Sequence, residues 1–144
     1  MKNHLFFLFV FLILSCNSVD PDPNLNNQDE FTSQANLLNG IWLLKDPTSA
    51  VKDGSIILDF KDLNLIFSNG SNTGGNFSTL NSVDFDVWPN SGSWQFQNND
   101  KSKLIRSDNV VLSISLSNTI LRITFTVSGG LKEGNWTFDF IKKQ

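Results

Sequence analysis

Few residues in this chain can act as a catalytic acid, base or metal ligand. His4 is the only histidine, and it lies in an N-terminal segment that we expect to be cleaved. Without it the chain has no imidazole for a Ser-His-Asp triad or a zinc site. Two carboxylate pairs remain, Asp84 with Asp86 and Asp59 with Asp62, which suit hydrolysis or a hard cation. Such aspartates are more often solvated loop and edge residues, so we predict no enzyme activity, no metal and no cofactor.

The N-terminal segment has the organisation of a secretory signal peptide. A short basic start precedes an unbroken apolar run from Leu5 to Leu14, and Ser15 stands directly before Cys16, the only cysteine. The run is too short to span a bilayer, which needs about 20 apolar residues. Residues 1–15 are therefore predicted to be a signal peptide. A single cysteine also allows no disulfide within the chain.

The residues around Cys16 resemble the lipobox of bacterial lipoproteins, in which the cysteine is lipidated and becomes the mature N-terminus. The resemblance rests on Ile13-Leu14-Ser15-Cys16 and implies acyl chains such as palmitate on Cys16. Two acyl chains suffice for a stable anchor, so the membrane is the first predicted partner. The alternative is an ordinary thiol behind an uncleaved helix.

Residues 16–36 are predicted to be a flexible acidic tether between the lipidated cysteine and a folded domain. They are rich in Asp and Asn and hold few apolar side chains, so they bury too little surface to offset the entropy of ordering. A turn over residues 31–38 is the one helical possibility. Acidic residues soon after Cys16 resemble the surface-export signals of Bacteroidota lipoproteins. We therefore expect export to the outer membrane, with a periplasmic or a cell-surface position left open.

The charge of the chain argues against nucleic acid as a partner. The formal net charge is −3, and it becomes more negative when the signal peptide, which contains Lys2, is removed. Nucleic-acid binding rests on many Lys and Arg contacts with phosphates. The one local basic cluster is flanked by aspartates, so we interpret it as a solvated hairpin face: Lys101, Lys103 and Arg106.

Residues 37–144 are predicted to form one all-β domain. Apolar residues alternate with polar ones over residues 112–117, 121–127 and 136–140, which is the period of strands with one buried face. Shorter segments, among them residues 76–86, bring the number of strands to eight or nine. Turns every 8–12 residues or so favour a small antiparallel β-barrel, or a flattened barrel or sandwich.

Three Gly-x-Trp motifs stand where strands are predicted to begin, and the first resembles the opening motif of lipocalins. The motifs are Gly40 with Trp42, Gly92 with Trp94 and Gly134 with Trp136. With the block Phe85–Phe96, they make residues 37–142 similar to the lipocalin-like domain of short Bacteroidota lipoproteins. The resemblance implies an eight-stranded barrel in which Trp42 closes one end. It also implies an arginine over Trp42; Arg122 is the candidate, although alternation places it on the polar face.

Two classes of function remain open. A lipocalin-like barrel implies a small hydrophobic or amphipathic ligand, entering between the Asn69–Asn76 loop and Trp88-Pro89, with Phe77 and Phe85 as further contacts. The alternative is an interaction or structural envelope protein with a filled core, or a surface glycan-binding module in which an exposed Trp88 stacks on a sugar. Ordinary packing of Trp88 is the competing interpretation. A cavity of about 300 Å³ or more would favour a ligand, and a solid core would favour interaction.

Overall fold

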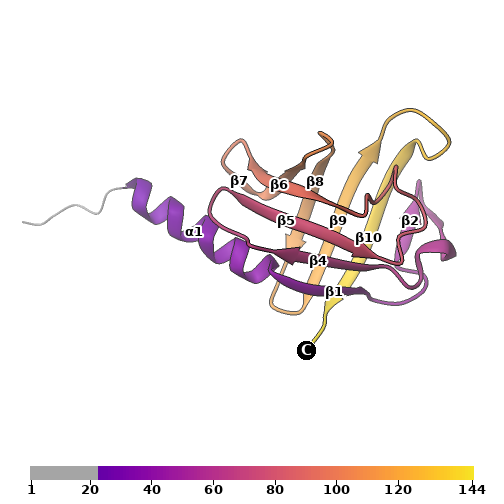
Figure 1. Ribbon diagram of the computed structural model, residues 1–144, viewed down its shortest axis with the longest axis horizontal. Coiled ribbons are helices and arrows are strands. Elements are labelled where there is room, and N and C mark those ends of the chain that lie inside the picture. The colour runs from indigo at the N-terminus through magenta and orange to yellow at the C-terminus, as the bar shows by residue number, and fades with distance from the viewer. Residues whose placement is uncertain (1–22) are drawn as a thin grey trace, which may run out of the picture.

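The structure is a computed structural model that describes residues 23–144, with side chains from Gln28 onward (Figure 1). The predicted signal peptide, Cys16 and the start of the predicted tether lie outside the described residues. In chain order the elements are α1 (Pro23–Leu38), β1 (Gly40–Leu44), β2 (Ala50–Lys52), β3 (Ser55–Ile56), the short 3-10 helix η1 (Leu58–Phe60), β4 (Asn64–Ser68), β5 (Gly74–Leu80), β6 (Ser91–Gln97), β7 (Asp100–Arg106), β8 (Val111–Leu116), β9 (Ile120–Val127) and β10 (Gly134–Lys142).

Eight of these strands close into an antiparallel barrel. The order around it is β1-β4-β5-β6-β7-β8-β9-β10, and pairing of β1 with β10 closes it. Trp42 lies opposite Lys142 in this last pairing. The hairpin of β2 and β3 extends the sheet beside the first half of β10, with Ala50 opposite Phe138. The predicted small all-β antiparallel barrel is confirmed.

Alternation along β10 places three aromatic side chains inside the barrel. Trp136, Phe138 and Phe140 are at most 1% exposed. The Phe138 ring stacks between the other two, with centroid distances of 5.7 Å to Trp136 and 6.1 Å to Phe140. On the neighbouring strand β9, the Phe125 ring stacks on Phe138 at 5.9 Å. The period-two pattern thus builds one continuous aromatic layer within the barrel wall.

The prediction of a flexible tether is wrong over residues 23–36, because these residues belong to helix α1. Phe31, Ala35 and Leu38 follow the i, i+4, i+7 spacing of one helix face. Ala35 and Leu38 are completely buried, and Phe31 packs edge-on against Phe96 of β6 with centroids 4.9 Å apart. Contacts with the barrel therefore order this segment, although most of its residues are polar. Among residues 23–144, no helix has the length and apolarity needed to cross a membrane.

The C-terminal turn of α1 is fastened to the first and last strands. The Trp42 indole Nε1 donates to the Leu38 carbonyl at 2.7 Å, and Lys142 Nζ donates to the Leu37 carbonyl at 2.6 Å. These donors satisfy carbonyls that the end of a helix leaves without partners. Lys142 Nζ also lies 5.1 Å from the ring centroid of Trp42. A lysine on β10 thus takes the place over Trp42 for which Arg122 was the candidate, while Arg122 pairs with Asp139 on the outer face.

The glycines of the first two Gly-x-Trp motifs permit close packing beside the buried tryptophans. Gly40 has φ of +131°, in the region that favours glycine, and a Cβ there would lie 2.9 Å from Lys142 Cε. A Cβ on Gly92 would lie 2.7 Å from Cε1 of Phe77. Trp42 and Trp94 are at most 1% exposed. Both tryptophans therefore belong to the core, as the competing interpretation of a ligand contact would not require.

Candidate functional site

The interior of the barrel is occupied by Trp88. Strand β5 ends at Leu80, so the prediction of a strand over residues 76–86 is wrong in its second half; residues 81–90 form the loop from β5 to β6. This loop folds inward and places the Trp88 indole among aromatic rings. Its centroid lies 5.2 Å from that of Phe125, 5.6 Å from Phe138 and 6.5 Å from Phe77. Trp88 is 0% exposed, so of its two interpretations ordinary packing is confirmed and exposure at an open rim is wrong.

Local hydrogen bonds hold the loop in this inward position. The Trp88 backbone N–H donates to the Asp84 carbonyl at 2.9 Å, which closes one turn of chain. The Ser82 hydroxyl donates to the Trp88 carbonyl at 2.6 Å. Lys132, from the loop between β9 and β10, forms an ion pair with Asp84 at 3.4 Å. The loop is therefore held at Trp88 and over the residues that precede it. Trp88 Nε1 itself is buried without a hydrogen-bond partner among the described residues.

The Arg106 guanidinium is the charged neighbour of Trp88. Its central carbon lies 5.2 Å from the Trp88 ring, 5.4 Å from Phe125 and 5.9 Å from Phe77, which is cation–π range. It donates to the Val87 carbonyl at 2.9 Å. Arg106 is 2% exposed, so its assignment to a solvated basic face is wrong.

The other two members of the basic cluster, Lys101 and Lys103, are exposed as predicted. About half of each side chain is accessible to solvent. Lys101 Nζ lies 2.7 Å from Glu30 of α1, so it joins the helix to β7. A surface pair of this kind stabilises little, and the packing of α1 rests on its apolar face instead.

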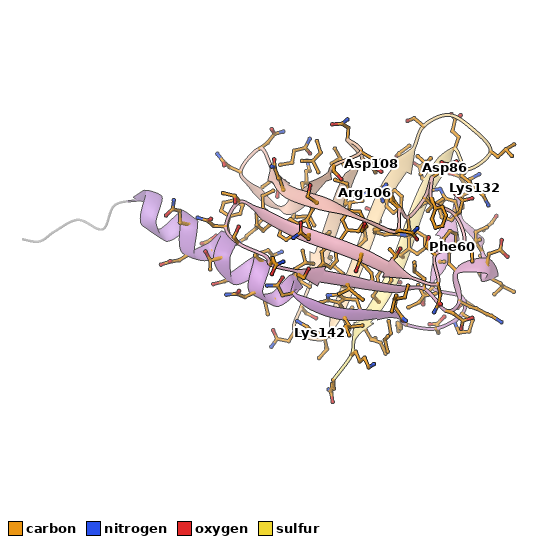
Figure 2. All side chains as sticks on the ribbon, viewed as in Figure 1. Phe60, Asp86, Arg106, Asp108, Lys132 and Lys142 are labelled. Atoms are coloured by element: carbon orange, nitrogen blue, oxygen red, sulfur yellow. The ribbon has the colours of Figure 1, made fainter. Side chains whose placement is uncertain are left out.

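The carboxylate of Asp108 balances the buried charge of Arg106. Arg106 Nε donates to Asp108 Oδ1 at 3.0 Å, and Nη2 donates to Oδ2 (Figure 2). Partial burial alone would raise the pKa of Asp108. The hydrogen bonds and the positive charge of Arg106 outweigh burial, so the pKa lies below its ordinary value.

The depressed pKa of Asp108 predicts an acid-sensitive contribution to stability. A carboxyl with a lowered folded-state pKa stabilises the fold above its unfolded-state pKa, and this stability is lost as pH falls through the folded-state pKa. Asp108→Asn should therefore destabilise by about 1 kcal/mol at pH 7, a modest value because Asp108 is partly exposed. The difference from the unsubstituted protein should shrink below pH 4. Urea titrations from pH 3 to 7 measure it, and a difference independent of pH would contradict the role of this pair.

The predicted entrance does not exist as one opening, because its two sides lie at opposite ends of the barrel. Residues 69–73 join β4 to β5 at the end covered by α1 (Figure 1), where the Gly70 N–H donates to Asn39 Oδ1 at 3.0 Å. Trp88 enters from the loop at the other end of β5. Of the predicted ligand contacts, Phe77 and Trp88 meet inside the barrel, whereas Phe85 is 58% exposed on the surface.

The interior is filled. The exposed fractions of Trp42, Leu65, Trp88, Phe138 and Phe140 are all 0%, so no space as large as a water molecule adjoins these side chains. The end near α1 is covered by buried Leu38, and Phe60 of η1 packs on the aromatic layer at the other end, 5.5 Å from the Trp136 ring. By the distinction between a cavity and a solid core, these side chains form a solid core.

Two of the surface hollows lie outside the barrel, at the end away from α1. We call this the distal end; it comprises the β2–β3 turn, η1 and the loops β5–β6, β7–β8 and β9–β10. One open hollow of about 640 Å³ runs from η1 and the start of β4 to Val83. A second, of about 660 Å³, lies between Phe85, Asp108 and Thr126. Both are lined mainly by polar side chains and loop backbone.

The two carboxylate pairs also lie at the distal end, but the structure gives them no catalytic arrangement. Asp84 is committed to Lys132 and accepts from the Asp86 backbone N–H at 3.0 Å. Asp59 and Asp62 line the first hollow beside Lys61. Over the part of the chain that is described, no three acidic, histidine or cysteine side chains gather as a metal site requires.

Sequence reasoning thus found Phe77 and Trp88 but missed Arg106 and Lys142, whose charges contact buried tryptophans. The inward position of Arg106 could have been predicted from its spacing of two residues from the apolar Leu104.

No family model, curated protein or solved structure matches this chain.

Proposed function

We propose that this chain is an exported, lipid-anchored envelope protein that acts through the surface of a solid β-barrel. It is neither an enzyme nor a carrier of an enclosed ligand. The observation that supports this proposal is the complete burial of Trp88 in the space that a ligand would need. The barrel is interpreted as lipocalin-like, with its own indole in place of a ligand.

The proposed anchor agrees with the position of α1. Cys16 precedes the helix, and the N-terminal end of α1 points away from the barrel (Figure 1). Lipidation at Cys16 puts the outer membrane on the side of α1 and leaves the distal end facing away from it. A glycan-binding function has less support, because Trp88 is buried and the described surface offers Phe85 as the large exposed aromatic.

Native mass spectrometry of the full chain, purified in detergent from the membranes of cells that make it, tests this function. We expect the mass of the chain from Cys16 onward with its acyl groups and no further bound molecule. The expectation follows from a core without space for one. One additional lipid or sterol per chain, retained after detergent exchange, would overturn the proposal and restore the ligand-carrier interpretation.

A further inference from the structure

Exposed large apolar side chains gather at the distal end. The six that lie there are each more than half exposed: Ile56, Leu58, Leu80, Val83, Phe85 and Leu131. In the described part of the chain, two other large apolar side chains are exposed, Ile120 to 52% and Ile141 to 40%, and both lie elsewhere. Isolated exposed apolar residues are ordinary on a protein surface, whereas a concentration at one end marks an interaction site.

The loop from β5 to β6 forms an apolar ridge at the centre of this end. Its Val83 lines the first hollow and its Phe85 lines the second, so the two side chains stand on opposite sides of one loop. The same loop carries Trp88 into the core, and the ion pair of Asp84 with Lys132 braces it. The ridge is therefore a rigid feature, which lowers the entropy that a partner must overcome on binding.

Acidic side chains flank the ridge on both sides. Asp59 and Asp62 line the first hollow, and Asp86 lines the second. None of the three forms an ion pair with another described residue. Lys132 is engaged with Asp84 and Arg106 with Asp108, whereas Lys61 lines the first hollow together with the two aspartates. The distal end thus combines exposed apolar side chains with an excess of negative charge, because Asp59, Asp62 and Asp86 outnumber Lys61.

We propose that the distal end binds a protein segment whose apolar side chains are flanked by lysine or arginine. The apolar side chains of the partner cover Val83 and Phe85, and its cations reach the aspartates in the two hollows. Such complementarity governs the rate and specificity of association, while the central aromatic side chain contributes most of the affinity. A second copy of this chain fits poorly, because it presents the same negative charges. This inference rests on the proposed function of a surface-acting envelope protein.

Site-specific photo-cross-linking in cells that make the full chain tests the proposal. The photoreactive residue p-benzoylphenylalanine replaces Val83 in one variant and Phe85 in another. Matched controls carry it at Ser113 and Ser115, which are exposed on the barrel wall in β8. We expect one protein adduct from both ridge positions and none from the controls. Mass spectrometry of the cross-linked peptide should find more Lys and Arg than Asp and Glu around its apolar residues.

The contributions of charge and of apolar contact to binding are then measured separately, by adding further substitutions to the variant that carries the photoreactive residue at position 83. Phe85→Ala should reduce the adduct about tenfold, as expected for the loss of a central aromatic contact. Joint replacement of Asp59, Asp62 and Asp86 by asparagine should also reduce it about tenfold, and 0.5 M NaCl should imitate this effect. Circular dichroism of each variant verifies the fold, since all these side chains are at the surface.

Several outcomes would overturn the proposal. They are the absence of a ridge-specific adduct, an adduct with a second copy, an adduct with lipid, and a partner segment that is acidic or insensitive to salt. These results leave the native mass of the protein unchanged. Failure of the docking proposal is therefore distinguishable from the finding of an enclosed ligand.

Discussion

Replacement of Trp88 by alanine should lower the free energy of unfolding by about 3–5 kcal/mol. The indole is completely buried and contacts the Phe77, Phe125 and Phe138 rings, so its removal leaves a cavity that the rigid barrel wall cannot fill. Urea titration of purified protein measures the loss. Phe85→Ala is the matched control from the same loop, and it should change stability by less than about 0.5 kcal/mol because Phe85 is exposed.

The cavity in Trp88→Ala should accept a small aromatic molecule. Engineered apolar cavities bind such molecules, and binding to the folded state raises stability. Indene should stabilise this variant more than indole does, because the indole N–H would again be buried without a partner, like Trp88 Nε1. Thermal shifts with both molecules provide the measurement. Equal stabilisation of the unsubstituted protein would mean that its interior is already open.

Replacement of Cys16 by alanine should move the protein out of the membrane fraction completely. Two acyl chains of about 15 methylenes each contribute on the order of 20 kcal/mol of membrane affinity, which no other predicted feature replaces. Detergent phase partition of fractionated cells measures the change, with Ser18→Ala as the control at a neighbouring residue. Unaltered partition of Cys16→Ala into the detergent phase would exclude the proposed anchor.

The alternation of apolar and polar residues predicted the strands well, because successive side chains of a strand point to opposite faces whichever strands it pairs with. This accounts for the correct aromatic face of β10. By the same rule, Arg106 belongs on the inner face of β7 with Leu104, although its charge favours a solvated position. Arg106 is buried because Asp108, two residues away, and three aromatic rings from other segments compensate its desolvation.

Two features depended on tertiary contacts that no local pattern contains. The helix α1 is polar over most of its surface, and it is ordered through Phe31, Ala35 and Leu38, whose partners lie on the barrel. Trp88 precedes a proline, as expected at the end of a strand, but its inward direction depends on a loop held by Ser82 and Asp84. A sequence pattern predicts where a chain turns more readily than which side chain enters the core.

The closure of the barrel has a consequence for the order of folding. Strand β1 pairs with β10, and the bond from Lys142 to the Leu37 carbonyl joins residues 105 positions apart. This closing contact cannot form until β10 is available to pair with β1. Until then β1 presents an unpaired edge, the kind of surface on which chains aggregate. Folding should therefore be slow and late, as for other proteins of high contact order. Chains truncated before β10 should accumulate as substrates for chaperones and proteases.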